Sequence, residues 1–275
     1  MVSDHIEHLD ILFIPTSSQK FKMAKYRMIM LVALFVFLSG KGFSMDYSMA
    51  KRLTEDRECR SCNLEAGNLA GVQFINFDLS NANLAKAHLE GSNLNNSNLA
   101  GVNLQEAHLF SVSMVGCNLE EANLSGVDLQ GADLSGSYLP GANLSGSDLS
   151  NANFSGAILR DADLSNAILK GTLLKEADLS GANLSGANLT DADLVKANLS
   201  PATLLGATLT RTNLSDTNLV KANFEEATLF HTNLTGAIVT NGRYIIPELR
   251  AAKLCYSILP NVRRSFRDCW TMDAH

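Results

Sequence analysis

Residues 177–201 read ADLSG ANLSG ANLTD ADLVK ANLSP, with a leucine at every fifth position. A period of five fits neither common element as a long run. On an α-helix five residues turn the chain by about 500°, so successive leucines lie roughly 140° apart and form no stripe. On a β-strand an odd period sends successive leucines to opposite faces. The pattern therefore predicts that every repeat contains a turn.

The repeat keeps its register over most of the chain. From Leu64 to Val239 there are 36 repeats, and the central residue is Leu in 31 of them. Two residues before the centre 20 repeats have Ala, and between these two positions 24 repeats have Asn or Asp. Alternate side chains of a short extended segment point the same way, so Ala and Leu face inward while Asn or Asp faces outward. The other two residues, often Ser-Gly or Thr-Asp, have the composition of a bend.

A short strand and a bend, repeated many times, close the chain into a stack of coils. The repeats of such a solenoid are stable only through contacts with their neighbours. Asn63, Asn83 and Asn103, which are four repeats apart, begin a column of nine in which only Asp163 and Thr203 differ. A spacing of three repeats gives no such column. The sequence therefore indicates four repeats per coil.

The A-[D/N]-L-x-x repeat, as in ADLSG, ANLSG and ANLTD, resembles the pentapeptide repeat family. The resemblance covers 180 of 275 residues. It implies an all-β fold, a right-handed quadrilateral β-helix of about nine coils, which would be ~40 Å long at the spacing of paired strands. We expect this β-helix at residues 62–241, an N-terminal helical cap at 45–61 and a C-terminal cap or tail at 242–275. Caps are expected because the ends of a solenoid are open edges.

The N-terminus has the order of a secretory signal peptide. A basic segment at Lys20–Arg27 precedes the apolar run Met28–Leu38, and small or polar residues follow. Eleven apolar residues are short for a membrane span. We therefore expect an extension and signal peptide at residues 1–44, with the true start at Met23, cleavage near Ser44 and a periplasmic or secreted product without a stable membrane span. An uncleaved N-terminal anchor is the alternative.

The predicted repeat region is acidic. Residues 62–241 contain 18 acidic and 7 basic residues. This balance argues against direct nucleic-acid binding through a basic surface. The acids divide as 5, 4, 4 and 5 among the four expected faces, so that no face is selectively acidic.

Four of the five cysteines lie outside the repeats or at their edge. The fifth, Cys117, occupies an inward position, as expected of a small buried hydrophobe. In an exported chain the outer four suggest disulfides. The two ends of the rod are too distant for a bond, whose Cα atoms lie within ~7 Å, so the expected pairs are Cys59–Cys62 and Cys255–Cys269. The flanks ECRSCNL and LCYSILP resemble those of exported family members. A redox dithiol or half a zinc site at Cys59 and Cys62 is the alternative.

Four repeats per coil place His88, His108, Asp128 and Asp148 in one outward column, each ~4.8 Å from the next. Imidazole and carboxylate groups are metal ligands, and a His beside an Asp can act as a general base. The simpler interpretation is a column of exposed polar positions, because a flat surface has no pocket that excludes water. We therefore predict no metal site and no cofactor. The sequence contains no phosphate-binding loop, nucleophile elbow or HExxH motif, so we predict that the protein is not an enzyme.

Outward apolar residues give a second candidate surface. Tyr138 and Ile158 are expected to be neighbours in one column, and Ile168 and Leu173 replace the usual Asn or Asp in the next coil. Apolar residues gathered on a rod can mark a partner surface, although scattered exposed apolar residues are common.

These observations favour a non-catalytic exported scaffold or binding rod with an unidentified protein partner. The family resemblance implies an alternative, a DNA mimic that binds DNA gyrase, because some family members resemble duplex DNA in width and acidity. That partner requires the cytosol, which the N-terminus argues against. A secreted effector is a lesser alternative, and association of two rods into a homo-oligomer stays open.

Overall fold

The computed structural model describes residues 56–239, 253–259 and 264–265. The chain divides into two units, Met1–Asp56 and Arg57–His275, and the described structure belongs almost entirely to the second. The expected signal peptide at residues 1–44 and positions 45–55 of the expected helical cap lie outside the described residues. Within the described residues, none of the helices is both long and apolar enough to cross a membrane.

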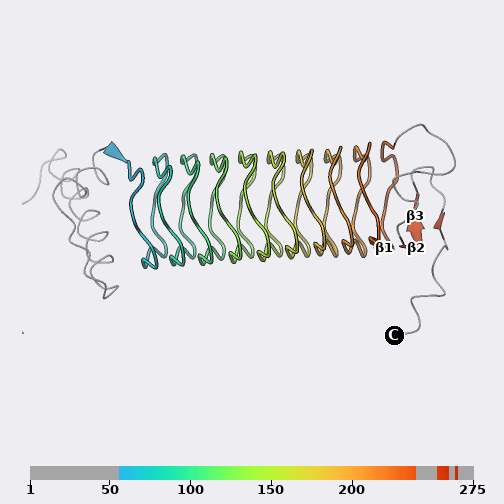
Figure 1. The fold of residues 1–275 in the computed structure, drawn as a ribbon, viewed down its shortest axis with the longest axis horizontal. Helices are drawn as coiled ribbons and strands as arrows, with labels where there is room; N and C mark the ends of the chain where they lie inside the picture. The colour runs from blue at the N-terminus through green and yellow to red at the C-terminus, as the bar shows by residue number, and fades with distance from the viewer. Residues whose placement is uncertain (1–55, 240–252, 260–263, 266–275) are drawn as a thin grey trace, which may run out of the picture. The chain divides into compact units, whose positions relative to one another are not determined.

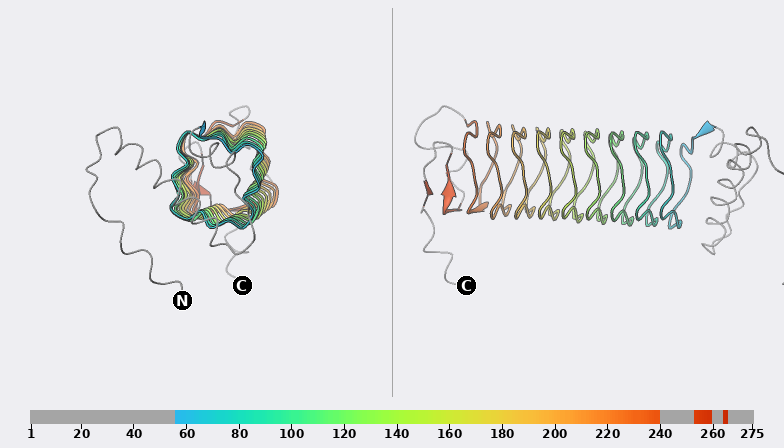
Figure 2. Two further views of the ribbon diagram at one scale, coloured as in Figure 1. Left: turned by 90° about the vertical axis from the view of Figure 1, so that its left-hand side faces the viewer. Right: turned by 180° about the vertical axis from the view of Figure 1, so that it is seen from behind.

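The repeats form a stack of coils with four repeats in every coil. From Glu58 to Asn218 the residue before the central residue of each repeat makes a parallel bridge to its equivalent four repeats later, as in the series Asn83, Asn103 and Asn123. The coils lie side by side in Figure 1, and their outline seen from the end in Figure 2 is a square. The 36 repeats therefore make nine coils of a right-handed quadrilateral β-helix, which confirms the predicted fold class.

A tight turn forms the corner between consecutive repeats. It is closed by a backbone hydrogen bond, as from the Ala82 N–H to the Leu79 carbonyl oxygen at 3.0 Å. The residue two after the central leucine has a positive φ, 72° at Gly181 and 57° at Asn81. This is the third residue of a type II turn, a position that Gly and Asn accept most readily. Gly and Asn are therefore frequent at this position because the corner turn requires a positive φ.

The inside of the coils is filled by the central leucines and by the small residues two positions before them. Leu104 and Leu144 are 0% exposed, as are most of the central residues. Where a hydroxyl replaces the small apolar side chain, it donates to a backbone carbonyl. The acceptor belongs to the preceding coil for Thr172 Oγ1, which donates to the Leu149 oxygen at 2.8 Å, and to the same coil for Ser92 Oγ, which donates to the Leu89 oxygen at 2.7 Å. Each buried leucine contributes roughly 1.5–3 kcal/mol before conformational entropy is counted. Neighbouring coils thus hold one another together.

The first coil begins earlier than predicted. Glu58 already forms a parallel bridge to Asp78, and Cys59, which is fully buried, occupies the position of a central leucine. Residues 58–61 therefore belong to the β-helix, whereas an N-terminal helical cap was predicted for residues 45–61. The period was missed at this point because the inward position holds Cys instead of Leu.

The C-terminal end continues the stack after Val239. Strand β1 (Thr228–Phe230) pairs in parallel with β2 (Lys253–Cys255), and a parallel bridge joins Asn233 to Ile258. Strand β3 (Ser257–Ile258) also pairs antiparallel with β4 (Arg264–Ser265). The segment predicted as a C-terminal cap or tail thus adds further repeats to the β-helix. Its strand β4 covers the outer edge of β3, which is the task expected of a cap.

Candidate functional site

The outward residues form four columns, one on each wall of the β-helix. We call the column from Asn63 to Asn223 the asparagine wall and the column from Asn68 to Thr228 the histidine wall. The columns from Gln73 to Asn233 and from Glu58 to Ile238 are the third and fourth walls. Within each column, parallel bridges join residues that are four repeats apart.

The side chains of the asparagine wall join one coil to the next. Asn83 Nδ2 donates to Asn63 Oδ1 at 3.1 Å, Asn103 Nδ2 to Asn83 Oδ1 at 3.1 Å, and Asn123 Nδ2 to Asn103 Oδ1 at 3.2 Å. The third and fourth walls contain bonds of the same kind, such as Asn153 to Asp133 and Asn118 to Asn98. These ladders satisfy the amide groups and add to the cohesion of the rod.

The histidine wall lacks this ladder. Its column consists of Asn68, His88, His108, Asp128, Asp148, Ile168, Asn188, Thr208 and Thr228. All nine residues lie in the described part of the chain, and none of their side chains forms a hydrogen bond to the next member of the column. The outward side chains of this wall therefore do not join one coil to the next, and the contacts that they form are local ones.

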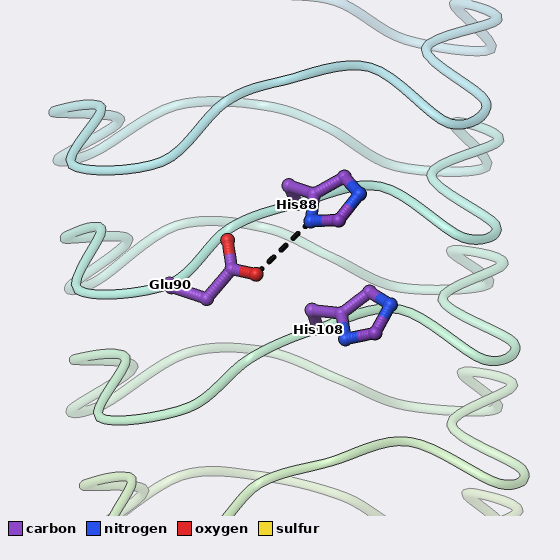
Figure 3. Close-up of side chains that lie close together, drawn as sticks. All are labelled: His88, Glu90 and His108. Carbon is purple, nitrogen blue, oxygen red and sulfur yellow. Dashed lines mark hydrogen bonds and ion pairs between the residues drawn. The ribbon is translucent and has the colours of Figure 1, made fainter.

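Two imidazole rings and a carboxylate gather on the histidine wall (Figure 3). The rings of His88 and His108 are stacked, with centroids 4.7 Å apart and planes 3° from parallel. His88 Nδ1 lies 3.0 Å from Glu90 Oε1. One ligand atom from each of the three residues lies within 4.8 Å of those from the other two. We call His88, Glu90 and His108 the histidine cluster.

Glu90 is held ionised by its surroundings. Burial raises the pKa of Glu90, but the hydrogen bonds from His88 and from the Glu90 backbone, together with the charges of both histidines, outweigh this effect. The net result is a pKa below the ordinary glutamate value. A carboxylate is therefore present beside the imidazoles at neutral pH.

Asp128 and Asp148 follow the histidines in the column but do not join the cluster. Bridges connect His108 to Asp128 and Asp128 to Asp148, as the spacing predicts. Neither aspartate belongs to the group of ligand atoms formed by the histidine cluster. Each instead accepts a hydrogen bond from the backbone N–H two residues later, at 3.1 Å for Asp128 and 3.0 Å for Asp148.

Sequence reasoning missed Glu90, because only the residues before the central leucines were compared. Glu90 follows Leu89, and the residues before and after a central leucine point to the same side. The same rule places Phe110, which is 51% exposed, beside His108. Its backbone is bonded to the neighbouring coil, through the Gly91 N–H and the Phe110 oxygen. Comparing the residues after Leu89 and Leu109 as well as the residues before them would have found both Glu90 and Phe110 from the sequence.

The four apolar residues of the expected partner surface lie on three different walls. Tyr138 and Ile158 are bridged neighbours on the fourth wall, whereas Ile168 lies on the histidine wall and Leu173 on the third wall. Tyr138, Ile168 and Leu173 are about equally exposed, at 41–42%. Only Tyr138 and Ile158 are thus brought together by the coil.

Several acids outside the histidine wall are paired with cations. On the fourth wall, Asp178 Oδ2 lies 2.5 Å from Arg160 Nε. At a corner, Arg211 forms a bidentate ion pair with Asp191, in which Nε donates to Oδ1 and Nη2 donates to Oδ2, each at 2.6 Å. Within the described residues, Asp128 and Asp148 have no such cation. The acidic excess of the repeats is therefore partly neutralised away from the histidine wall.

The cysteines at the ends are oxidised where the structure describes them. Cys59 and Cys62 form a disulfide, with an S–S distance of 2.05 Å and Cα atoms 5.3 Å apart. Cys255 is also disulfide-bonded, while Cys269 lies outside the described residues, so its expected pairing stays a prediction. Cys117 is a buried thiol, and burial raises its pKa to about 11, as expected of an inert inward residue.

Comparison with protein families gives one match along the β-helix. A family model described as pentapeptide repeats matches eight overlapping segments, residues 58–96, 78–114, 87–126, 103–141, 128–166, 138–175, 167–204 and 207–242. A comparison with curated protein sequences finds no match.

The solved structures that are similar to this chain include HetL and QnrB1. HetL, a pentapeptide repeat protein involved in heterocyst differentiation regulation from the cyanobacterium Nostoc sp. strain PCC 7120, is 30% identical. That match covers 82% of this chain and 100% of HetL, with a TM-score of 0.54. QnrB1, a plasmid-mediated fluoroquinolone resistance protein, is 18% identical over 72% of this chain and 91% of QnrB1, with a TM-score of 0.50. At that identity the likeness to QnrB1 concerns the fold alone.

Proposed function

This chain belongs to the pentapeptide repeat family, and from that premise we propose that it is a non-catalytic exported rod that binds a protein partner through its histidine wall. The observation that carries this proposal is the unequal use of the four walls. Three walls use outward amides to join coil to coil, whereas the histidine wall does not. A wall that contributes no ladder keeps its side chains for an external contact.

The composition of the histidine wall suits a protein partner. Phe110 and Ile168 are exposed apolar side chains, and Asp128 and Asp148 lie between them along the rod. Apolar anchors beside hydrogen-bonding groups are the common anatomy of a protein interface. The coils from His88 to Ile168 extend ~19 Å at the spacing of paired strands, a length comparable with a small interface.

Two features support export. The basic segment and apolar run before residue 44 have the order of a signal peptide. The disulfide at Cys59–Cys62 and the oxidised Cys255 fit an oxidising compartment, where such bonds persist. In the reducing cytosol these cysteines would be expected as thiols.

The DNA-mimic function receives less support. A mimic of duplex DNA needs continuous negative charge, but the acids divide evenly among the four walls and several are paired, as at Asp178 and Asp191. A gyrase partner also requires the cytosol. Neither the charge distribution nor the N-terminus favours that function over the exported rod.

The first experiment determines where the mature protein is located. Cells that express a C-terminally tagged chain are fractionated, and the N-terminus of the product is sequenced. We expect a periplasmic or extracellular product that begins near Met45. A full-length cytosolic product would contradict export and make the DNA-mimic function the leading one.

A second experiment tests the wall. A photo-crosslinking amino acid replaces Asp148 on the histidine wall or, as a matched control in the same coil, Asn143 on the asparagine wall. We expect crosslinks to one partner protein from position 148 and none from position 143. Equal crosslinking from both positions, or from neither, would count against binding through the histidine wall.

A further inference from the structure

We propose that His88, Glu90 and His108 form a surface site for one late first-row divalent metal ion, such as Zn²⁺ or Cu²⁺. The site does not depend on the proposed partner-binding function. It departs from the sequence-based prediction of no metal site, because that prediction considered only the column and did not bring Glu90 to the two histidines.

The distances fit a chelating pair with a third ligand nearby. Zinc lies ~2.1 Å from imidazole nitrogen and carboxylate oxygen, so two ligand atoms of one ion lie about 3.0–3.4 Å apart. His88 Nδ1 and Glu90 Oε1 are 3.0 Å apart, which meets this requirement without movement. An ion bound by both atoms takes the place of the direct contact between His88 Nδ1 and Glu90 Oε1.

His108 needs only a small adjustment to become the third ligand. Its ligand atom lies within 4.8 Å of those of His88 and Glu90, and its ring is stacked on that of His88. His108 is exposed, and within the described residues its side chain forms no hydrogen bond that would have to break. A rotation of the imidazole that tilts it out of the parallel stack turns a nitrogen toward the ion.

The charges around the cluster favour a cation. Glu90 contributes a carboxylate beside the two imidazoles, since a glutamate side chain is ionised at neutral pH. Asp128 lies one coil beyond His108 in the same column. No cation lies within ion-pair distance of Glu90 apart from His88 among the described residues. A divalent ion would thus meet a carboxylate that has no lysine or arginine partner among the described residues.

The chemistry of the donors selects the class of metal. Two imidazoles and one carboxylate suit Zn²⁺ and Cu²⁺ better than Mg²⁺ or Ca²⁺, which prefer oxygen ligands. Three protein ligands leave a coordination position open to water or to a donor from another molecule. The square coil fixes the spacing of the two histidines, because their backbones are bridged as neighbouring strands.

The test uses variants that the fold already accepts. Asn is the residue at the equivalent positions Asn68 and Asn188, so His88→Asn and His108→Asn are expected to fold like the parent. The third variant is Glu90→Gln. The matched control is His231→Asn, which removes an exposed histidine at a corner where other repeats have Asn.

Binding of Zn²⁺ to the purified full chain without a histidine tag is measured by calorimetry, and Cu²⁺ is followed by its electron paramagnetic resonance. We expect one ion per chain, with nitrogen hyperfine structure from two imidazoles. Loss of one ligand should weaken binding by at least ~10–100-fold, the effect known for removal of even an outer-shell partner. Glu90→Gln should weaken binding and keep both nitrogens in the spectrum.

The control and Mg²⁺ complete the design. His231→Asn should bind Zn²⁺ like the parent, and Mg²⁺ should show no heat of binding at this site. The proposal is overturned if His88→Asn and His108→Asn bind Zn²⁺ as tightly as the parent, or if the copper spectrum of the parent shows no second nitrogen from the cluster. Circular dichroism of each variant verifies that loss of binding is not loss of fold.

Discussion

The asparagine wall and the histidine wall are neighbours on the same coils, with the same backbone bridges and the same buried leucines behind them, yet their outward residues have different tasks. On the asparagine wall several amides donate to the side-chain oxygen of the preceding coil, as Asn103 does to Asn83. On the histidine wall the equivalent His108 forms no such bond and instead lies in a cluster with the His88 imidazole and the Glu90 carboxylate. The repeat thus places side chains that join the coils on one wall and side chains that face solvent without joining the coils on the next wall.

The largest expected effect tests whether the buried leucines behind the two walls contribute equally to the stability of the fold. Leu104 lies behind the asparagine wall and Leu109 behind the histidine wall, and both are 0% exposed. We expect Leu104→Ala and Leu109→Ala each to lower the free energy of unfolding by ~2–5 kcal/mol through lost burial and cavity formation. Urea unfolding followed by circular dichroism measures both. A much smaller loss at Leu109 would show that the walls differ in their packing as well as in their display.

The next effect tests the ladder itself. Asn103→Ala removes two amide hydrogen bonds between coils and the acceptor for the Gln105 N–H, and we expect a loss of ~1–3 kcal/mol. His108→Ala removes no ladder bond and should change stability by less than ~0.5 kcal/mol, as surface substitutions usually do. The comparison of the two walls fails if both alanine variants unfold at the same urea concentration.

A smaller effect concerns acid. Burial raises the pKa of Asp178, but hydrogen bonds from Arg160 and Ser180 and the Arg160 charge lower it overall. A carboxyl whose folded pKa lies below its unfolded value of ~3.9 contributes stability above that pH, which is lost as the pH falls through the folded pKa. Arg160→Gln should therefore flatten the decrease of the urea midpoint between about pH 5 and pH 3.

Its control, Arg160→Lys, keeps the charge and should retain most of the decrease. An unchanged pH profile in Arg160→Gln would show that the ion pair between Arg160 and Asp178 does not contribute to stability. The ion pair is exposed on the arginine side, so the effect should be small and should shrink further in high salt.

The smallest effect on stability is expected at the exposed apolar residue of the histidine wall. Ile168→Asn introduces the residue that the ladder walls prefer, directly before Asn188 in the column. We expect a change within ~0.5 kcal/mol and reduced crosslinking of the partner from position 148. A large gain in stability would mean that Ile168 destabilises the rod relative to the residue that the other walls prefer. Unchanged crosslinking would show that Ile168 is not part of the contact with the partner.

Much of the fold follows from the sequence because each repeat carries its own evidence. The period of five implies a corner, the alternation around Leu implies inside and outside, and the column of asparagines implies four repeats per coil. Each of these is a local steric or hydrogen-bonding requirement, and the structure shows the corresponding turn at Gly181 and ladder at Asn83.

The ends were harder to predict, because there the local pattern changes. Cys59 replaces the inward leucine of the first coil. At the other end Leu254 keeps the period of five, but Lys253 pairs with Thr228, which lies five repeats earlier instead of four. A comparison of columns at a spacing of four repeats therefore does not detect that β2 continues the stack.

The histidine cluster shows a different limit. The neighbouring positions of His88 and His108 follow from the spacing of four repeats alone. The contribution of Glu90 depends on a side-chain conformation that turns its carboxylate along the wall to His88 Nδ1, and a period cannot determine a conformation. The sequence places candidates on a wall, whereas the structure decides which of them meet.

Between Glu58 and Ile238 bridged positions keep a constant offset of four repeats, which has a consequence for how this part of the chain can change in length. Duplication or removal of a whole coil, for example residues 143–162, leaves every later residue on the same wall and joins compatible edges. Loss of a single repeat would instead rotate all later columns by a quarter turn and move every ladder to another wall. The β-helix can therefore be lengthened by duplication or shortened by deletion in steps of one coil, and the remaining outward residues stay on the same walls.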